Sequence, residues 1–306
     1  MDGRQGELTI ERMCILAAVS RASYYRFGVH GADVDEEESR LRDAIQRVAI
    51  ESRQYGYRRV THALRAQGWE VNHKRTARLM REDGLLAIRK RRFVPQTTDS
   101  RHDFEVAINV ARRLTPTAIN QLWVADITYV RLGRADVFLA VVLDAFSRKV
   151  VGWNLGPRLT TELSLAALTN AIDSRRPPPG LIHHSDRGVQ YASGAYVDAL
   201  IQHGMIPSMS RPGNPYDNAK CERFMKTLKQ EEIYCSEYRD MEDLRANLSV
   251  FLDRYYNATR LHSALGYLSP DEFEKRAAQS ATAEIPQAPR MSFSRHEEIY
   301  PSDVRP

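Results

Sequence analysis

The chain has 306 residues, of which 42% are hydrophobic and 27% charged, proportions typical of a soluble globular protein and a length that suggests two domains. Its three cysteines are too few and too widely spaced for a disulfide framework or a cysteine-rich zinc site, which favours a reduced, cytosolic setting. No apolar run approaches the ~18 residues of a membrane-spanning helix, and the N-terminus lacks a signal-peptide pattern, so we expect no membrane association.

Positive charge is concentrated in one segment. The whole chain has a net charge of +5, whereas residues 53–92 alone hold 12 Lys or Arg against 3 Asp or Glu. This excess indicates a polyanionic partner, and double-stranded DNA is the expected one.

The first 92 residues are predicted to be helical. Residues 1–30 form a short helical segment, and residues 31–92 a small all-α domain of the helix-turn-helix kind. Apolar stripes predict its first two helices, at residues 36–50 and from Tyr57 to about Leu64. Asn72 is the expected N-cap of the third helix, at residues 73–83, and Gly84 its C-terminal stop.

Basic side chains of this domain are the candidate DNA contacts. Lys74, Arg78 and Arg81 recur on one face of the third helix, with Arg75 beside them, and a basic run follows. The alternative is a helical bundle with a solvated basic face. The candidates are Arg58, Arg59, Lys74, Arg75, Arg78, Arg81, Arg89, Lys90, Arg91 and Arg92.

The rest of the chain predicts an α/β domain. Residues 93–120 look like a linker with a short helix at 103–113, and residues 279–306 like a disordered tail. Between them, residues 121–278 alternate in the order βββαβαβα, which describes a mixed sheet covered by helices. The first three strands have short connections and form an antiparallel meander, and Ser269 with Glu272 is the capping box of a last helix.

Three acids of this domain are candidate metal ligands. Asp126 lies within an apolar strand, Asp186 ends another strand, and Glu222 follows the start of a helix near residue 219. Carboxylates meeting from two strands and a helix would bind hard divalent ions that assist attack on a phosphodiester. Each also has a structural alternative: a buried ion pair for Asp126, a turn for Asp186 and a solvated helix flank for Glu222. Asp144 and Asp217 have equally good explanations as turn and cap residues.

The helix that carries Glu222 has two distinct faces. An apolar stripe packs it on the domain, and at about 100° per residue Glu222, Lys226 and Lys229 gather on a different face. The two lysines are therefore further candidate DNA contacts. The apolar stripe consists of Cys221, Phe224, Met225 and Leu228.

Four motifs carry a family resemblance. They read WVADITYV, HHSDRGVQY, GNPYDNAKCERFMKTLK and YNATRLHSALGYLSP, and together they resemble the catalytic reading frame of bacterial insertion-sequence transposases with two overlapping frames. YGYRRVTHAL and the basic helix after it resemble the N-terminal helix-turn-helix domain of that family, so the match runs from about residue 10 to 275. Cys221 and Met225 depart from the small or aromatic residues expected there, which affects packing only.

The resemblance implies a fold, a site and a chemistry. The fold is a ribonuclease-H-like, retroviral-integrase-type core, and the DDE triad maps onto Asp126, Asp186 and Glu222, with 35 residues between the last two acids. Lys229 matches a basic residue of the motif. Two Mg²⁺ ions, or Mn²⁺ in their place, assist water in freeing a 3′-OH at the element's end. That hydroxyl then attacks another phosphodiester, usually at the other end of the same element.

The resemblance also implies partners and leaves alternatives. We expect a homo-oligomer on the element's inverted repeats and on target DNA, the product of a small upstream reading frame as fusion or partner, and action at the nucleoid in the bacterial cytosol. A ribonuclease-H-like nuclease and a catalytically silent DNA-binding regulator are the alternatives. Retroviral integrase itself is disfavoured because the sequence has no His-His-Cys-Cys zinc module.

Overall fold

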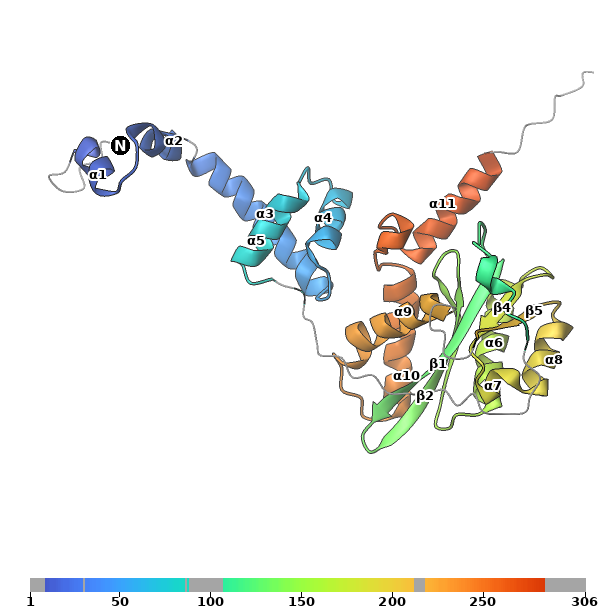
Figure 1. Ribbon diagram of the computed structural model, residues 1–306. Coiled ribbons are helices and arrows are strands. Elements are labelled where there is room, and N and C mark those ends of the chain that lie inside the picture. The colour runs from blue at the N-terminus through green and yellow to red at the C-terminus, as the bar shows by residue number, and fades with distance from the viewer. Residues whose placement is uncertain (1–8, 30, 86, 88–106, 212–217, 284–306) are drawn as a thin grey trace, which may run out of the picture.

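The computed structural model describes residues 9–29, 31–85, 87, 107–211 and 218–283. Figure 1 shows an N-terminal helical part beside a mixed α/β core. The basic run Arg89, Lys90, Arg91 and Arg92 lies outside the described residues, as does Asp217.

Five helices form the N-terminal part, as the sequence predicts. The short helices α1 (Ile10–Leu16) and α2 (Arg21–Val29) come first. The compact domain consists of α3 (Gly31–Glu51), which begins earlier than expected, α4 (Tyr57–Ala66) and α5 (His73–Glu82). Asn72 caps α5 by accepting a hydrogen bond from the Lys74 N–H at 2.9 Å. Apolar side chains of the three helices form one core that includes Leu41, Ile45, Val60, Leu64 and Leu79.

A five-stranded mixed sheet forms the centre of the second domain. The strands are β1 (Leu122–Leu132), β2 (Ala135–Asp144), β3 (Val150–Gly156), β4 (Ile182–Ser185) and β5 (Ile206–Met209). Their spatial order is β3-β2-β1-β4-β5. The first three strands form the predicted antiparallel meander, whereas β4 runs parallel to both β1 and β5. The sheet therefore places β1 and β4 side by side at its centre.

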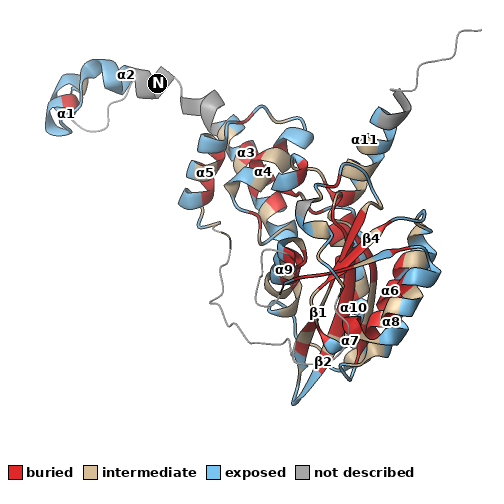
Figure 2. Ribbon diagram, turned by 45° about the vertical axis from the view of Figure 1, so that its right-hand side comes forward, coloured by how far each residue is buried: buried red, intermediate tan, exposed pale blue. Residues whose placement is uncertain are grey.

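Helices cover both faces of this sheet. One face packs against α6 (Thr161–Arg175), α7 (Val189–Ala192) and α8 (Gly194–Gln202). The other packs against α9 (Ala219–Leu228) and α10 (Met241–Ser249). Figure 2 shows the buried residues gathered in the sheet between these two layers. At Gly152 of β3 an added Cβ would lie 2.4 Å from the Ala167 carbonyl oxygen, so this glycine permits the close approach of α6.

Several predicted boundaries need correction. The helix α9 continues in π-helical geometry as η3 (Lys229–Ile233), and α10 as η4 (Val250–Asn257). The helix expected at residues 103–113 is, within the described residues, one 3₁₀ turn, η1 (Ala111–Arg113). Residues 279–283, assigned to the tail, belong to α11 (Pro270–Ala283), while residues 284–306 lie outside the described part. The capping box of α11 is confirmed, because Ser269 and Glu272 exchange side-chain-to-backbone hydrogen bonds.

The helical domain contacts the C-terminal part of the core. The Leu261 N–H donates to the Tyr55 hydroxyl at 2.8 Å. The rings of His62 and Tyr267 stack with their centroids 3.7 Å apart. Residues 55–62 of the helical domain thus rest on residues 261–267, which follow η4.

Candidate active site

Asp126 and Asp186 lie at the same end of neighbouring strands. The last residue pair of the parallel β1–β4 ladder is Val124 with His184, and each aspartate follows two residues later. Side chains alternate along a strand, so Asp126 projects on the face of Leu122 and Val124. Those residues pack in the same core as α9, and the acids from the two strands therefore face the helix that carries Glu222.

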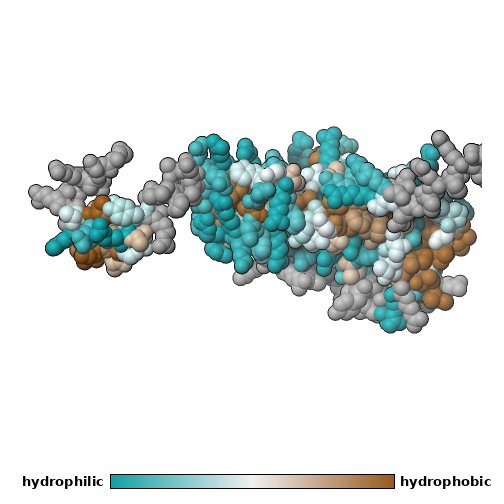
Figure 3. Space-filling view, turned by 90° about the horizontal axis from the view of Figure 1, so that it is seen from above, coloured by the Kyte–Doolittle hydropathy of each residue, from teal (hydrophilic) through white to brown (hydrophobic). Residues whose placement is uncertain are grey.

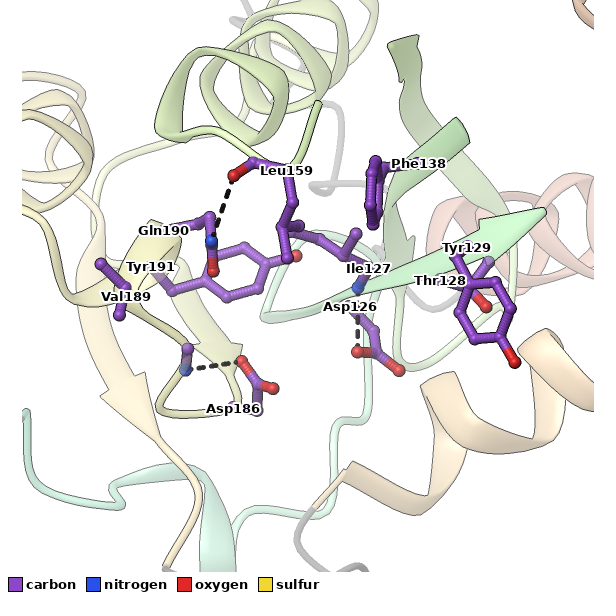
Figure 4. Close-up of a pocket in the computed structure, with 11 residues that line it drawn as sticks. Asp126, Ile127, Thr128, Tyr129, Phe138, Leu159, Asp186, Val189, Gln190 and Tyr191 are labelled. Carbon is purple, nitrogen blue, oxygen red and sulfur yellow. Dashed lines mark hydrogen bonds between the residues drawn. The ribbon is translucent and has the colours of Figure 1, made fainter. Parts of the chain in front are cut away.

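The two aspartates open into one pocket. The Asp126 Oδ1 atom accepts from the Ile127 N–H at 2.9 Å, and the Asp186 Oδ1 atom from the Gly188 N–H at 3.0 Å. Figure 4 shows both carboxyl groups turned towards the same open space. The pocket has a volume of about 110 Å³, and its wall includes Tyr129 and Gln190 but not Glu222.

Asn218 joins the start of α9 to β1. Its side-chain amide donates to the Ala125 carbonyl oxygen at 3.1 Å, beside Asp126, and makes no capping hydrogen bond to α9. Asn218 is the N-cap residue of α9 by position, but its side chain ties the helix to β1 instead of capping it. Glu222 follows on the first turn of α9 with its side chain exposed.

Electrostatics connect the three acids. Burial, together with the charges of Asp186 and Glu222, raises the pKa of Asp126 to about 8, while the Ile127 N–H and Lys229 oppose the shift. Burial also raises the pKa of Glu222. Among the described residues, no three His, Cys, Asp or Glu side chains are arranged to hold a metal ion. The acids therefore repel one another without forming a closed metal cluster, and an all-carboxylate donor set of this kind fits a hard divalent cation.

The two candidate lysines of this helix differ in their contacts. The Lys229 Nζ atom lies 4.7 Å from the centre of the Tyr129 ring, and its charge is attracted by Asp126. Lys226 is exposed and forms no ion pair with Glu222. Lys229 is thus held near the acids, whereas Lys226 points to solvent.

The predicted DNA contacts of the helical domain fall into two groups. Arg75 lies 3.1 Å from Glu37, and Arg78 lies 2.9 Å from Glu38, so both cations are paired with acids of α3. Lys74, Arg81 and Arg58 are exposed and have no acidic partner in the described part of the chain. Arg59 is half-buried, 3.9 Å from Glu231 of η3, and faces the core domain.

The motif YNATRLH holds the core together, a role that sequence reasoning did not assign. Asn257 accepts from the Val150 N–H and donates to the Val150 carbonyl, both at 2.9 Å, and so joins η4 to β3. The buried Arg260 forms two hydrogen bonds with Glu231, at 2.6 and 2.7 Å. The motif itself marked these residues, but their partners, Val150 and Glu231, lie far away in the sequence.

Asp144 has a structural role, as its explanation as a turn residue predicted. This buried carboxylate accepts from the backbone N–H groups of Asn120, Phe146 and Ser147 at 2.7–3.0 Å, and Arg175 lies 4.0 Å away. Asp144 is therefore satisfied within the fold. In the described residues, no helix has both the length and the apolar character needed to cross a membrane.

Family models and solved structures both give matches to this chain. Two family models described as integrase core domain match residues 116–215 and 203–270, and a model described as HTH-like domain matches residues 36–93. The catalytic core domain of HTLV-2 integrase in complex with magnesium is 16% identical, with a TM-score of 0.40 over 52% of this chain and 98% of that chain. A chain of the simian T-cell lymphotropic virus intasome in complex with PP2A regulatory subunit B56 gamma is 15% identical, with a TM-score of 0.45 over 85% of this chain and 80% of that one.

The fold and its matches define an integrase-core protein with an HTH-like domain in front of the core. Transposase InsF for insertion sequence IS3A of Escherichia coli (strain K12) is 35% identical over 282 residues, 90% of this chain and 97% of that protein. The insertion element IS600 uncharacterized 31 kDa protein of Shigella sonnei is 39% identical over 272 residues, 88% of this chain and 100% of that protein. The chain belongs to this family of insertion-sequence transposases, which are enzymes of the DDE transposase and integrase type.

Proposed function

We propose that this transposase cleaves DNA at the ends of its insertion sequence and joins the freed 3′-OH to a second phosphodiester, with Asp126, Asp186 and Glu222 as its catalytic carboxylates. The observation that carries the proposal is the register of β1 and β4, which brings two aspartates to one pocket on the face covered by α9. Glu222 is included as the third carboxylate because its charge raises the pKa of Asp126.

The three carboxylates would hold Mg²⁺, with two ions expected and Mn²⁺ tolerated. Bound divalent ions would activate the attacking oxygen and stabilise the departing one. The chain's own groups prepare the donors: the Ile127 and Gly188 N–H groups each orient one aspartate oxygen. Asn218 fixes the start of α9 against β1, so the first turn of α9, which carries Glu222, begins beside the strand of Asp126.

The chemistry needs no covalent link between protein and DNA. Water attacks the phosphorus at the element's 3′ end, and the bond between phosphorus and the 3′ oxygen breaks, leaving a 3′-OH. The oxygen of that hydroxyl then attacks the phosphorus of a second phosphodiester, and another 3′ oxygen departs. Lys229 is suited to contact a phosphate that flanks the reacting bond, because its ammonium group is held beside the acids.

The helical domain would bind double-stranded DNA of the inverted repeats. Lys74, Arg81 and Arg58 are the better candidates, because Arg75 and Arg78 already pair with acids of α3. Lys226 and the run from Arg89 to Arg92 stay candidates. We further infer that the chain assembles as a homo-oligomer on DNA, acts at the nucleoid, and works with the product of an upstream reading frame.

The test is cleavage and joining of a duplex that carries one element end, in the presence of Mg²⁺. Asp126→Asn, Asp186→Asn and Glu222→Gln should each abolish cleavage while end binding and thermal unfolding are preserved. Asp198→Asn, which alters an exposed acid on α8, is the matched control and should cleave normally. Mg²⁺ should raise the melting temperature of the wild type and of the control. The rise should be smaller for each triad variant.

Three results would contradict parts of this proposal. Turnover at the wild-type rate by a triad variant removes that residue from the site. A wild type that binds ends but never cuts them supports the silent regulator. Cleavage of RNA in an RNA–DNA hybrid without joining of DNA ends supports the ribonuclease-H-like nuclease.

A further inference from the structure

A second pocket lies where the helical domain meets the core. Its wall combines Arg59 of α4, Arg148 of the turn between β2 and β3, Lys220 and Arg223 of α9, and Arg260, which follows η4. No acidic side chain of the described residues lines it, and its volume is about 110 Å³. We call this cavity the α9 pocket. Five cations from four separate segments thus surround one small space.

Three of these cations lack an acid to neutralise them. Arg260 is paired with Glu231 at 2.6 Å, and Arg59 lies 3.9 Å from the same carboxylate. The side chains of Arg148, Lys220 and Arg223 form no ion pair or hydrogen bond in the described parts of the chain, although the Arg148 backbone N–H donates to the Asp144 carbonyl oxygen at 2.9 Å. Burial lowers the pKa of Arg148, and the charge of Arg223 lowers it further. The charge of Asp144 acts on Lys220 without forming an ion pair, so the fold gathers more positive charge at this place than the neighbouring acids pair with.

The α9 pocket is separate from the acidic site, although both use α9. At about 100° per residue, Lys220, Arg223 and Thr227 share one face of the helix, and Glu222, Lys226 and Lys229 lie on another face about 120° away. Figure 1 shows α9 on the side of the core that faces the helical domain. A ligand in the α9 pocket would therefore touch a different face of the helix that carries Glu222.

The lining groups are donors suited to phosphate. Arginine presents a fork of N–H groups that matches phosphate oxygens, and lysine a point charge with three donors. The ring of His262 also lines the pocket, and its Nε2 atom is buried without a hydrogen-bond partner in the described structure. Exposure rises from the half-buried Arg148 and Lys220 to the exposed Arg223, so the cations extend from the pocket to the surface.

We propose that the α9 pocket binds a backbone phosphate of double-stranded DNA, as a second contact that works together with the helical domain. This inference rests on the proposed function in one respect, which is that DNA is the polyanion that the protein binds. Hydrophilic side chains cover the helical domain beside it in Figure 3, and the pocket includes a residue of each domain. A duplex bound by both domains would thus meet these cations at the junction. Binding there would also hold one face of α9 while the acids act beside another.

The experiment measures DNA binding by the full chain across a salt series, without divalent ions, so that cleavage plays no part. Arg148→Gln and Arg223→Gln should each weaken binding by about 3- to 10-fold and reduce the slope of log affinity against log salt by about 0.9, the value for one phosphate contact. Arg176→Gln is the matched control: it removes an exposed, unpaired arginine in the turn after α6 and should change neither quantity. Arg223→Lys should restore most of the affinity.

Thermal unfolding separates this role from a structural one. Without DNA, Arg148→Gln should melt at or above the wild-type temperature, because it relieves repulsion with Arg223. Wild-type affinity and salt slope in both glutamine variants would overturn the proposal. Stabilisation by inorganic phosphate that requires Arg148, with DNA affinity unchanged, would overturn it in favour of a small-anion site. A wild type that fails to cleave DNA tests only the proposed function.

Discussion

Replacing Asn257 with alanine should destabilise the core domain strongly. The ladder between β2 and β3 shifts register between Val142 and Leu143, where Val150 begins β3. Because β3 is an edge strand of the sheet, backbone groups on its outer side have no neighbouring strand to bond to. The Asn257 side chain, which is only 4% exposed, supplies both missing partners by bonding to the N–H and the carbonyl of Val150.

The magnitude follows from these two hydrogen bonds. Both measure 2.9 Å, and Val150 itself is 5% exposed, so water cannot replace the lost partners. Leaving a buried donor or acceptor unsatisfied costs about 1–3 kcal/mol, which gives about 2–6 kcal/mol for the pair. In a domain of this size the melting temperature should fall by about 5–15 °C.

The assay is thermal and urea unfolding followed by tryptophan fluorescence, because Trp123 is fully buried in this sheet. Asn247→Ala is the control: it is exposed on α10 and bonds only to Asp243 within its own helix, so it should cost less than about 0.5 kcal/mol. Asn257→Asp keeps the acceptor and loses the donor, so it should also destabilise. If Asn257→Ala unfolds like Asn247→Ala, the bridge to β3 does not stabilise the fold.

Three further predictions concern the site and the domains. Lys229→Ala should lose most strand joining, and its free energy of unfolding should fall by about 0.5–1 kcal/mol because the contact with Tyr129 is lost, whereas Lys226→Ala should keep its stability. Equal joining by the two variants would remove the special role of Lys229. Lys74→Gln should weaken DNA binding and its salt slope, whereas Arg78→Gln should mainly lower thermal stability, and the reverse order would refute the assignment. Burial lowers the pKa values of His183 and His262 to about 3, so as the pH falls below ~6.5 these histidines take up protons in the unfolded chain but not in the folded one. The free energy of unfolding should therefore fall by about 1.4 kcal/mol per pH unit for each histidine towards pH 5. Urea midpoints that do not change between pH 7 and 5 would contradict this.

The sequence by itself determined the local structure and the order of the elements. The helix α5 begins after the predicted cap Asn72, and Ser269 with Glu272 forms the predicted capping box, because these interactions join residues only two or three positions apart. The strands of the meander followed from alternation and turn residues for the same reason. The DDE assignment, by contrast, depended on the family motifs.

Only the tertiary structure decided how charges are paired. Arg75 and Arg78 read as free cations on a helix face, yet the acids of α3 take them up, and Arg59 faces Glu231 of the core instead of solvent. Neither the tether from Asn218 to Ala125 nor the α9 pocket has a local pattern, because their partners come from distant segments. The physical reason is that a side chain's periodicity shows which face of its element it occupies, while the packing of elements determines which charge or backbone group that face meets.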